Sequence, residues 1–202
     1  MNSHFLRLLL LSIVISASSF GCQNRESSSE KTLSKEDLSA YKQKGGEFVE
    51  ATQKVLASNL VGAIQEKGTE GALEFCNIQA IPLTDSMAVE LQAHIKRVTD
   101  QPRNPDNLAN ESELEYIRSA KSDLSEGNEV TPAIHYANGK VVGYYPIITN
   151  QLCMQCHGNE NSQINQATLE QIKTLYPDDQ ATGYDVGELR GIWVVEMEEQ
   201  SE

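Results

Sequence analysis

The sequence has few basic residues: 16 Lys and Arg stand against 29 Asp and Glu, a formal charge of −13 at pH 7. Nucleic acids and anionic membrane faces attract positive charge, so this balance argues against nucleic acid as a partner. It permits a basic protein partner. The apolar run at residues 8–17 is too short to span a bilayer, and the chain contains no internal repeat. We therefore expect one domain with a single core.

Cysteine is also scarce, and its four positions argue against several kinds of site. There is no second Cys-x-x-Cys and no His-x3–5-His to complete a zinc site, and no βαβ context for a thioredoxin-like pair. What is present is the run Cys153-Met154-Gln155-Cys156-His157. This spacing is typical of c-type haem attachment, because thiols at i and i+3 lie on one face of a helical turn. Each thiol can bond one haem vinyl group, and the next residue, His157, can ligate the iron. A redox pair, half a zinc site or a plain disulfide remain the alternatives.

The N-terminus has the pattern of an export signal over residues 1–21: Arg7, an apolar run, and small residues before the exit. The pair Gly21-Cys22 resembles a bacterial lipoprotein cleavage site, so Cys22 is the expected lipidation site. Ordinary secretory cleavage near residues 17–19 is the alternative. Residues 22–37 are rich in Ser and charge and are expected to form a flexible tether, followed by a haem-binding domain at residues 38–202.

These assignments predict a membrane-anchored lipoprotein exported to the bacterial periplasm or cell envelope. Export fits the haem interpretation, because the resemblance to c-type cytochromes implies attachment outside the inner membrane. Removal of the signal, which contains Arg7, leaves 15 basic and 29 acidic residues, a charge of −14. With Cys22, Cys153 and Cys156 assigned, only Cys76 is left, so no pair of cysteines remains for a structural disulfide.

Hydrophobic periodicity predicts helices first and strands later. Gly68, Gly71 and Pro82 are expected to end helices, and Asn110 with Glu113 resembles a capping box. Asn138-Gly139 between two β-rich runs predicts a hairpin. The order indicates an α+β fold with an antiparallel sheet. The expected helices cover residues 38–65, 69–82, 83–98, 110–124 and 166–176, and the expected strands cover residues 131–137, 140–149 and 189–197.

The sixth iron ligand would decide what such a haem can do, because an open position allows gas binding or peroxide chemistry. Cys76 lies on the apolar stripe of its predicted helix, and His94 and Met87 share one face of the next. From the residues alone Cys76 and His94 are about equally good candidates. The alternatives are a buried structural thiol for Cys76, a solvent-facing ring for His94, a core position for Met87 and a surface position for His135.

Several segments together resemble a bacterial family of single-haem c-type proteins with a PAS-like sensor fold, formerly known as a domain of unknown function. The resemblance implies a PAS-like antiparallel sheet, a long N-terminal helical segment and one covalent haem c. It also implies that iron is ligated by His157 and Cys76. The segments that carry it are residues 72–80, 96–99, 103–107, 144–147, 153–158, 176–184 and 187–191.

A thiolate ligand is a strong anionic donor, so it should stabilise ferric iron and make the reduction potential low. On reduction Cys76 could protonate and leave, which would suit a sensor. Arg97 and Arg103 are the best candidates for binding the haem propionates, since guanidinium pairs bidentately with carboxylate. The alternative for both is a solvated face or a charge at a helix C-terminus.

The leading hypothesis is therefore a haem protein for electron transfer or for redox or gas sensing, with an unknown redox or signalling protein as partner. The alternative is a haem enzyme, a peroxidase or small-oxyanion reductase, with an open iron position. The sequence offers no polar distal set for that chemistry. A third possibility is a PAS-like module with a purely structural haem. No segment has the pattern of a kinase or cyclase output domain, so a sensor would signal through a partner.

Overall fold

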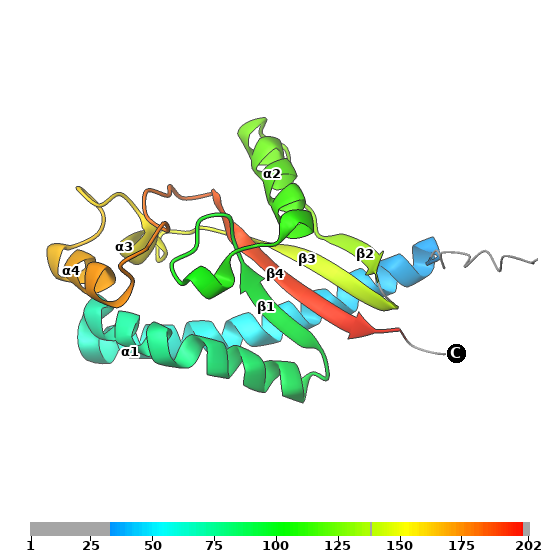
Figure 1. The fold of residues 1–202 in the computed structure, drawn as a ribbon, viewed down its shortest axis with the longest axis horizontal. Helices are drawn as coiled ribbons and strands as arrows, with labels where there is room; N and C mark the ends of the chain where they lie inside the picture. The colour runs from blue at the N-terminus through cyan, green and yellow to red at the C-terminus, as the bar shows by residue number, and fades with distance from the viewer. Residues whose placement is uncertain (1–32, 138, 200–202) are drawn as a thin grey trace, which may run out of the picture. The chain divides into compact units, whose positions relative to one another are not determined.

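A four-stranded antiparallel sheet forms the centre of the fold in a computed structural model, which describes residues 33–137 and 139–199. The strand order is β1-β4-β3-β2, so the last strand of the chain pairs between β1 and β3 (Figure 1). As the sequence predicts, β2 and β3 form a hairpin, with Gly139 at φ 78° in its turn. The strands are β1 His94–Val98, β2 Ala133–Ala137, β3 Lys140–Ile148 and β4 Leu189–Glu198.

Both faces of the sheet are covered, and the alternation of side chains assigns each residue to a face. In β4, Ile192 and Val194 pack toward helix α2 (Glu111–Ser125), whereas Trp193 and Val195 pack toward helix α1 (Lys35–Glu90). Helix α2 begins at the predicted capping box, where Asn110 and Glu113 bond each other's backbone N–H groups. The fold is thus two helical layers around one sheet.

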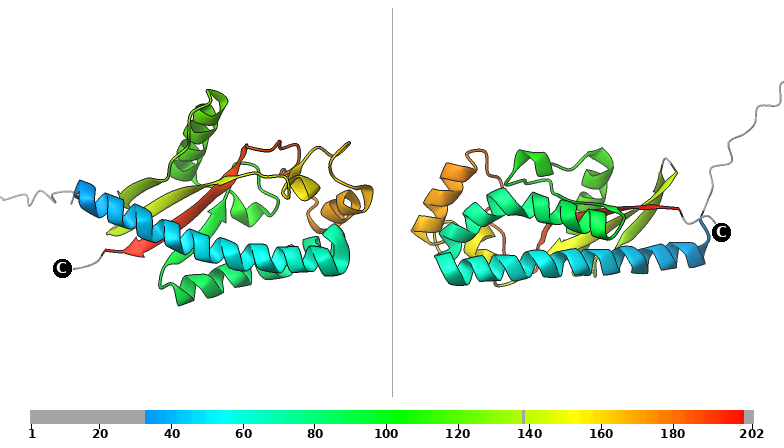
Figure 2. Two further views of the ribbon diagram at one scale, coloured as in Figure 1. Left: turned by 180° about the vertical axis from the view of Figure 1, so that it is seen from behind. Right: turned by 90° about the horizontal axis from the view of Figure 1, so that it is seen from below.

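Helix α1 is a hairpin of two arms that run back along each other (Figure 2). Its first arm, residues 35–67, starts at a capping box formed by Ser34 and Asp37. The arms meet at Gly68, whose φ of 70° and ψ of −176° lie in a region that essentially only glycine occupies. The second arm, residues 69–90, returns beneath the sheet. Gly68 therefore ends the first arm as predicted, whereas Gly71 lies inside the second arm.

Two predicted helix boundaries are wrong. The second arm runs through Pro82. This proline is exposed, and Ile78, whose carbonyl loses its helical N–H partner, is 62% exposed, so the cost of the lost bond is small there. The helix predicted for residues 83–98 ends at Glu90, and its last part is strand β1. Gln92 turns the chain at φ 53°, and the buried Ile95 then pairs with β4.

Two short helices close one end of the sheet: α3 (Met154–His157) and α4 (Gln166–Leu175). Helix α4 packs against the kink of α1, where the Thr69 and Thr168 hydroxyls bond each other and Asn165 donates to Thr69. Within residues 33–137 and 139–199, no helix is both long and apolar enough for a membrane span. The α+β fold class, with its antiparallel sheet and long N-terminal helical segment, is confirmed.

The predicted signal peptide at residues 1–21, the lipidation site Cys22 and most of the predicted tether lie outside the described residues. The end of that tether differs from the prediction. Helix α1 begins at Lys35, so residues 35–37 belong to its first turn.

Candidate functional site

The Cys-x-x-Cys-His run forms a tight helical turn directly after the central hairpin. Asn150 caps the turn, since its side-chain oxygen accepts a hydrogen bond from the Leu152 N–H at 2.9 Å. Cys153 and Cys156 are free and half-buried, and burial raises the pKa of the Cys156 thiol to about 11. Met154 is 1% exposed and belongs to the core. The two thiols and His157 thus lie within five successive residues, from the N-cap Cys153 to the last residue of α3.

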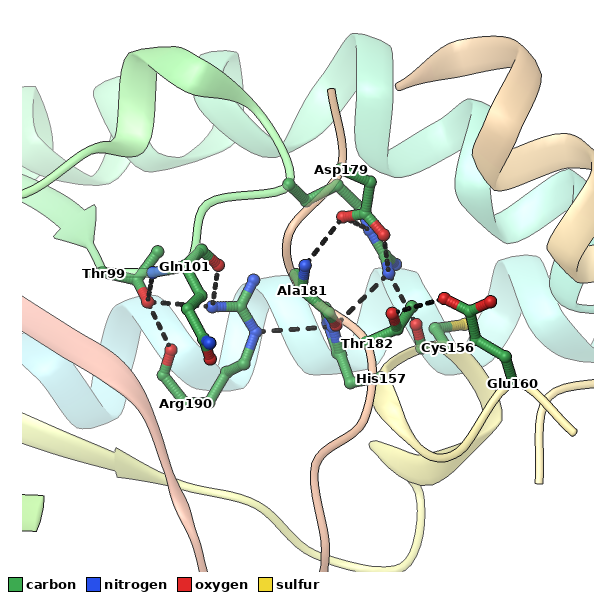
Figure 3. Close-up of polar contacts among 10 residues, drawn as sticks. Thr99, Gln101, Cys156, His157, Glu160, Asp179, Ala181, Thr182 and Arg190 are labelled. Carbon is green, nitrogen blue, oxygen red and sulfur yellow. Dashed lines mark hydrogen bonds and ion pairs between the residues drawn. The ribbon is translucent and has the colours of Figure 1, made fainter. Parts of the chain in front are cut away.

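His157 is oriented by a backbone carbonyl. Its Nδ1 lies 2.7 Å from the carbonyl oxygen of Ala181 (Figure 3). A carbonyl can only accept, so Nδ1 carries the proton and Nε2 keeps its lone pair for a metal. Arg190 Nε also lies 3.4 Å from Nδ1, but a protonated Nδ1 cannot accept from it. Burial lowers the pKa of His157 well below its usual value, and the charges of Arg103 and Arg190 lower it further. The ring is therefore neutral and ready to ligate.

Cys76 lies on the second arm of α1, half-buried beside the core residues Ala72 and Leu73. Burial raises the pKa of its thiol, while the nearby charges of Arg97 and Arg103 act in the opposite direction. The same two arginines act on His157, and Cys76 also acts on Cys156. The structure therefore brings the predicted ligands and both predicted arginines into one electrostatic neighbourhood.

Arg97 reaches this neighbourhood from strand β1. Its guanidinium carbon lies 5.3 Å from the centre of the Trp193 ring, in a cation–π contact. Burial lowers the pKa of Arg97, and the negative charge that Cys76 would carry raises it. Among the described residues Arg97 has no carboxylate within ion-pair distance. A half-buried cation without a carboxylate partner fits an anionic ligand group.

Arg103 has a different environment from the one predicted for it. Its Nε and Nη2 donate to the two carboxylate oxygens of Asp179 at 3.0 and 3.2 Å, and Nη2 also donates to the Cys156 carbonyl at 2.6 Å. Asp179 has no role in the sequence-based prediction. Binding of a propionate by Arg103 stays a prediction, but its contacts in the structure are with the protein.

Tyr184 and Arg190 are functional-site residues that sequence reasoning missed. The Tyr184 ring meets the His157 ring edge to face, with centroids 6.4 Å apart. Its hydroxyl is buried without a hydrogen-bond partner among the described residues. The Arg190 guanidinium lies over the Tyr184 ring and donates to Thr99 at 3.1 Å. Both residues lie in segments that carry the family resemblance, but no spacing rule assigned either a role.

The other candidate iron ligands lie elsewhere in the structure. His94 is on β1, not on a helix, with a side chain 60% exposed and Nδ1 3.9 Å from Glu196. His135 is an exposed residue of β2. Met87 is buried in the second arm of α1, as expected of a core residue.

Comparison with known proteins gives two matches. The family model described as Tll0287-like matches residues 24–197. The crystal structure of the cyanobacterial heme-protein Tll0287 is similar with a TM-score of 0.55 and 20% sequence identity, over 84% of this chain and 99% of that one. No curated protein matches the sequence. At this identity the structural likeness shows the fold.

Proposed function

We propose that this chain, which belongs to the Tll0287-like family, is an exported haem protein that acts in electron transfer or in redox or gas sensing. One haem c would be bound covalently through Cys153 and Cys156, with His157 and Cys76 as the iron ligands. The heme-protein Tll0287, whose fold this chain shares, supports haem as the ligand.

The observation that carries the proposal is the state of His157. It follows the two thiols directly, donates its Nδ1 proton to Ala181 and is kept neutral by burial. This is how proteins fix a metal-ligating histidine, since the bond at one ring nitrogen sets the orientation and tautomer of the other. A plain disulfide or a thiol redox pair would not require this arrangement.

Unpartnered polar groups at the site also fit a haem. The two propionates are carboxylates, and the half-buried Arg97 and the buried Tyr184 hydroxyl can donate to them. Arg190, held by Thr99 and the Gln101 carbonyl, is a further cation beside His157. We assign propionate binding to this set, with Arg103 as the sequence-based candidate beside it.

The bound haem would supply a one-electron centre, and the chain would tune it through its ligands. Burial raises the pKa of the Cys76 thiol, and the nearby charges of Arg97 and Arg103 partly offset this, so its thiolate form would depend on binding to ferric iron. An anionic sulfur ligand would keep the potential low. The acidic surface implied by the formal charge of −13 would suit a basic redox or signalling partner.

Extraction with acid-acetone, followed by a pyridine spectrum, tests the covalent attachment. Protein from a host that matures c-type haem should keep its colour and show the spectrum of a haem with two thioethers. The Cys153→Ser, Cys156→Ser double variant should release its haem under the same conditions. Loss of haem from the wild-type protein would show that the attachment is wrong.

Ferric spectra of Cys76→Ala and His94→Ala test the sixth ligand as a matched pair. Wild-type protein should be low-spin with thiolate charge-transfer bands. Cys76→Ala should lose these bands, gain a higher potential and bind cyanide, while His94→Ala should resemble wild type. The reverse result would identify His94 as the ligand, and an open iron position in wild type would favour the enzyme alternative.

A further inference from the structure

A nearly buried ion pair links the two loops that flank His157. The side chains of Arg103 and Asp179 are 10% and 9% exposed. Two contacts from the Arg103 guanidinium reach the Asp179 carboxylate, at 3.0 and 3.2 Å, in the bidentate geometry that is strong for Arg and carboxylate. The Arg103 guanidinium also lies 5.9 Å from the centre of the Tyr176 ring.

Both members of the pair act on the His157 hydrogen bond, and Arg103 contacts both of its sides, since its Nη2 also lies 3.5 Å from the Ala181 carbonyl oxygen. On the donor side, Arg103 Nη2 donates to the carbonyl of Cys156, the residue before His157, at 2.6 Å. On the acceptor side, Asp179 Oδ1 accepts the N–H of Ala181 at 3.1 Å, and the Ala181 carbonyl in turn accepts from His157. One more backbone bond, from Gln180 N–H to the Pro102 carbonyl at 3.0 Å, joins the same two loops.

We infer that Arg103 and Asp179 are positioning residues for His157, which hold its Nδ1–H on the Ala181 carbonyl and so set its strength as an iron ligand. The inference rests on the proposed function, since it concerns His157 as a ligand. A histidine that donates from Nδ1 to a fixed acceptor is more basic at Nε2 and donates more electron density to a metal. Weakening this bond should make ferric iron less favoured and raise the potential.

The Asp179→Asn variant distinguishes the positioning of His157 by the ion pair from a direct contact of Arg103 with haem. If Arg103 served a propionate, Asp179→Asn would leave the ligand bond of His157 almost unchanged. If the pair acts as a unit, Asp179→Asn and Arg103→Gln should have the same effect, because either one removes the ion pair. The double variant should then differ little from either single variant.

The experiment uses the haem-loaded protein and follows the hyperfine-shifted Nδ1 proton of His157 by NMR, together with the midpoint potential. We expect about ten-fold faster exchange of this proton in each single variant, from loss of one charge-assisted bond, and a potential shifted upward. Arg103→Lys should show a smaller change in the proton exchange and in the midpoint potential, since lysine keeps the positive charge but not the bidentate guanidinium. Arg118→Gln is the matched control, because it breaks an exposed Arg–Glu111 pair on α2 and should change neither.

Three results would overturn the inference. An unchanged Asp179→Asn beside a shifted Arg103→Gln would assign Arg103 to the propionates. Lower thermal stability in both variants with the same proton exchange and the same potential would make the pair merely structural. Wild-type haem protein without a histidine signal would overturn the proposed function itself, and the inference with it.

Discussion

At the scale of single residues, His157 belongs to a sequence motif, but the residues that orient it come from a distant loop. The spacing Cys153-x-x-Cys156-His157 predicts the ligand, but its partner Ala181 lies 24 residues further along the chain. Asp179, Tyr184 and Arg190 come together with His157 only when the loop before β4 folds back onto α3. No local pattern encodes that return, so these residues could not be predicted from spacing. Cys76 was one of two equal candidates until the family resemblance selected it.

The buried, neutral His157 makes the stability of the haem-free protein depend on pH. In the unfolded chain a histidine titrates near pH 6.5, whereas in the folded protein the pKa of His157 is well below that value. Below pH 6.5 the unfolded state therefore binds more protons. The contribution of His157 is complete above pH 6.5, and the free energy of unfolding should fall by up to about 1.4 kcal/mol per pH unit as pH decreases.

Urea unfolding between pH 5.0 and 7.5, on protein made without haem maturation, measures this slope. His157→Gln should flatten it, whereas His135→Gln, at an exposed histidine of β2, should not. An equal slope in wild type and His157→Gln would assign the pH dependence to other groups.

At the scale of elements, helix α1 shows which helix-breaking residues interrupt a helix and which do not. Pro82 normally predicts a helix end, but here Pro82 and Ile78, the residue whose carbonyl loses its N–H partner, are both exposed, and the helix continues. Gly68 is the residue that reverses the chain, and it does so with a backbone conformation that side chains exclude. Strand β1 is not predicted, because Ile95 and Val98 fit the apolar stripe of a helix as well as they fit a strand. In the structure Val98 packs on the side of the sheet that faces α2, and Ile95 packs on the side that faces α1.

Gly68→Ala should therefore disturb Cys76, the proposed ligand, eight residues further on the second arm. The φ of 70° and ψ of −176° at Gly68 would cost about 1–3 kcal/mol for alanine, and straightening of the kink would relieve that strain. We expect a lower thermal midpoint and partial loss of the thiolate bands of the ferric haem. Optical spectra recorded along a thermal melt measure both.

Gly127→Ala provides the matched control, because Gly127 follows α2 with φ 79° and has open space around it. It should lower the thermal midpoint by a similar kind of strain while the thiolate bands stay intact. If Gly68→Ala kept full thiolate bands, the kink would not be what holds Cys76 in place.

At the scale of the whole domain, the candidate site lies at the end of the sheet closed by α3 and α4, and three separate stretches of the chain build it. The second arm of α1 contributes Cys76, β1 and its following loop contribute Arg97 and Arg103, and the segment from α3 to β4 contributes the rest. Apart from strand β1, the helical and strand content could be predicted from periodicity and turn residues. The meeting of these stretches could not, because it depends on the pairing of β4 between β1 and β3.

The same helix that presents Cys76 begins shortly after the predicted lipid site, so attachment of the protein to a membrane is the remaining question at this scale. Cys22→Ser should move the protein from the membrane fraction to the soluble exported fraction. The release should be complete, because a domain of formal charge −14 after signal removal gains nothing from anionic lipid headgroups. Acyl chains, at about 0.8 kcal/mol per buried CH₂, would be the source of binding.

Fractionation with immunoblotting measures where the protein is found. A wash with 1 M salt should leave the wild-type protein on the membrane. Cys76→Ser is the control variant and should fractionate as the wild type does. A wild-type protein that is already soluble and begins near Phe20 would instead show ordinary secretory cleavage.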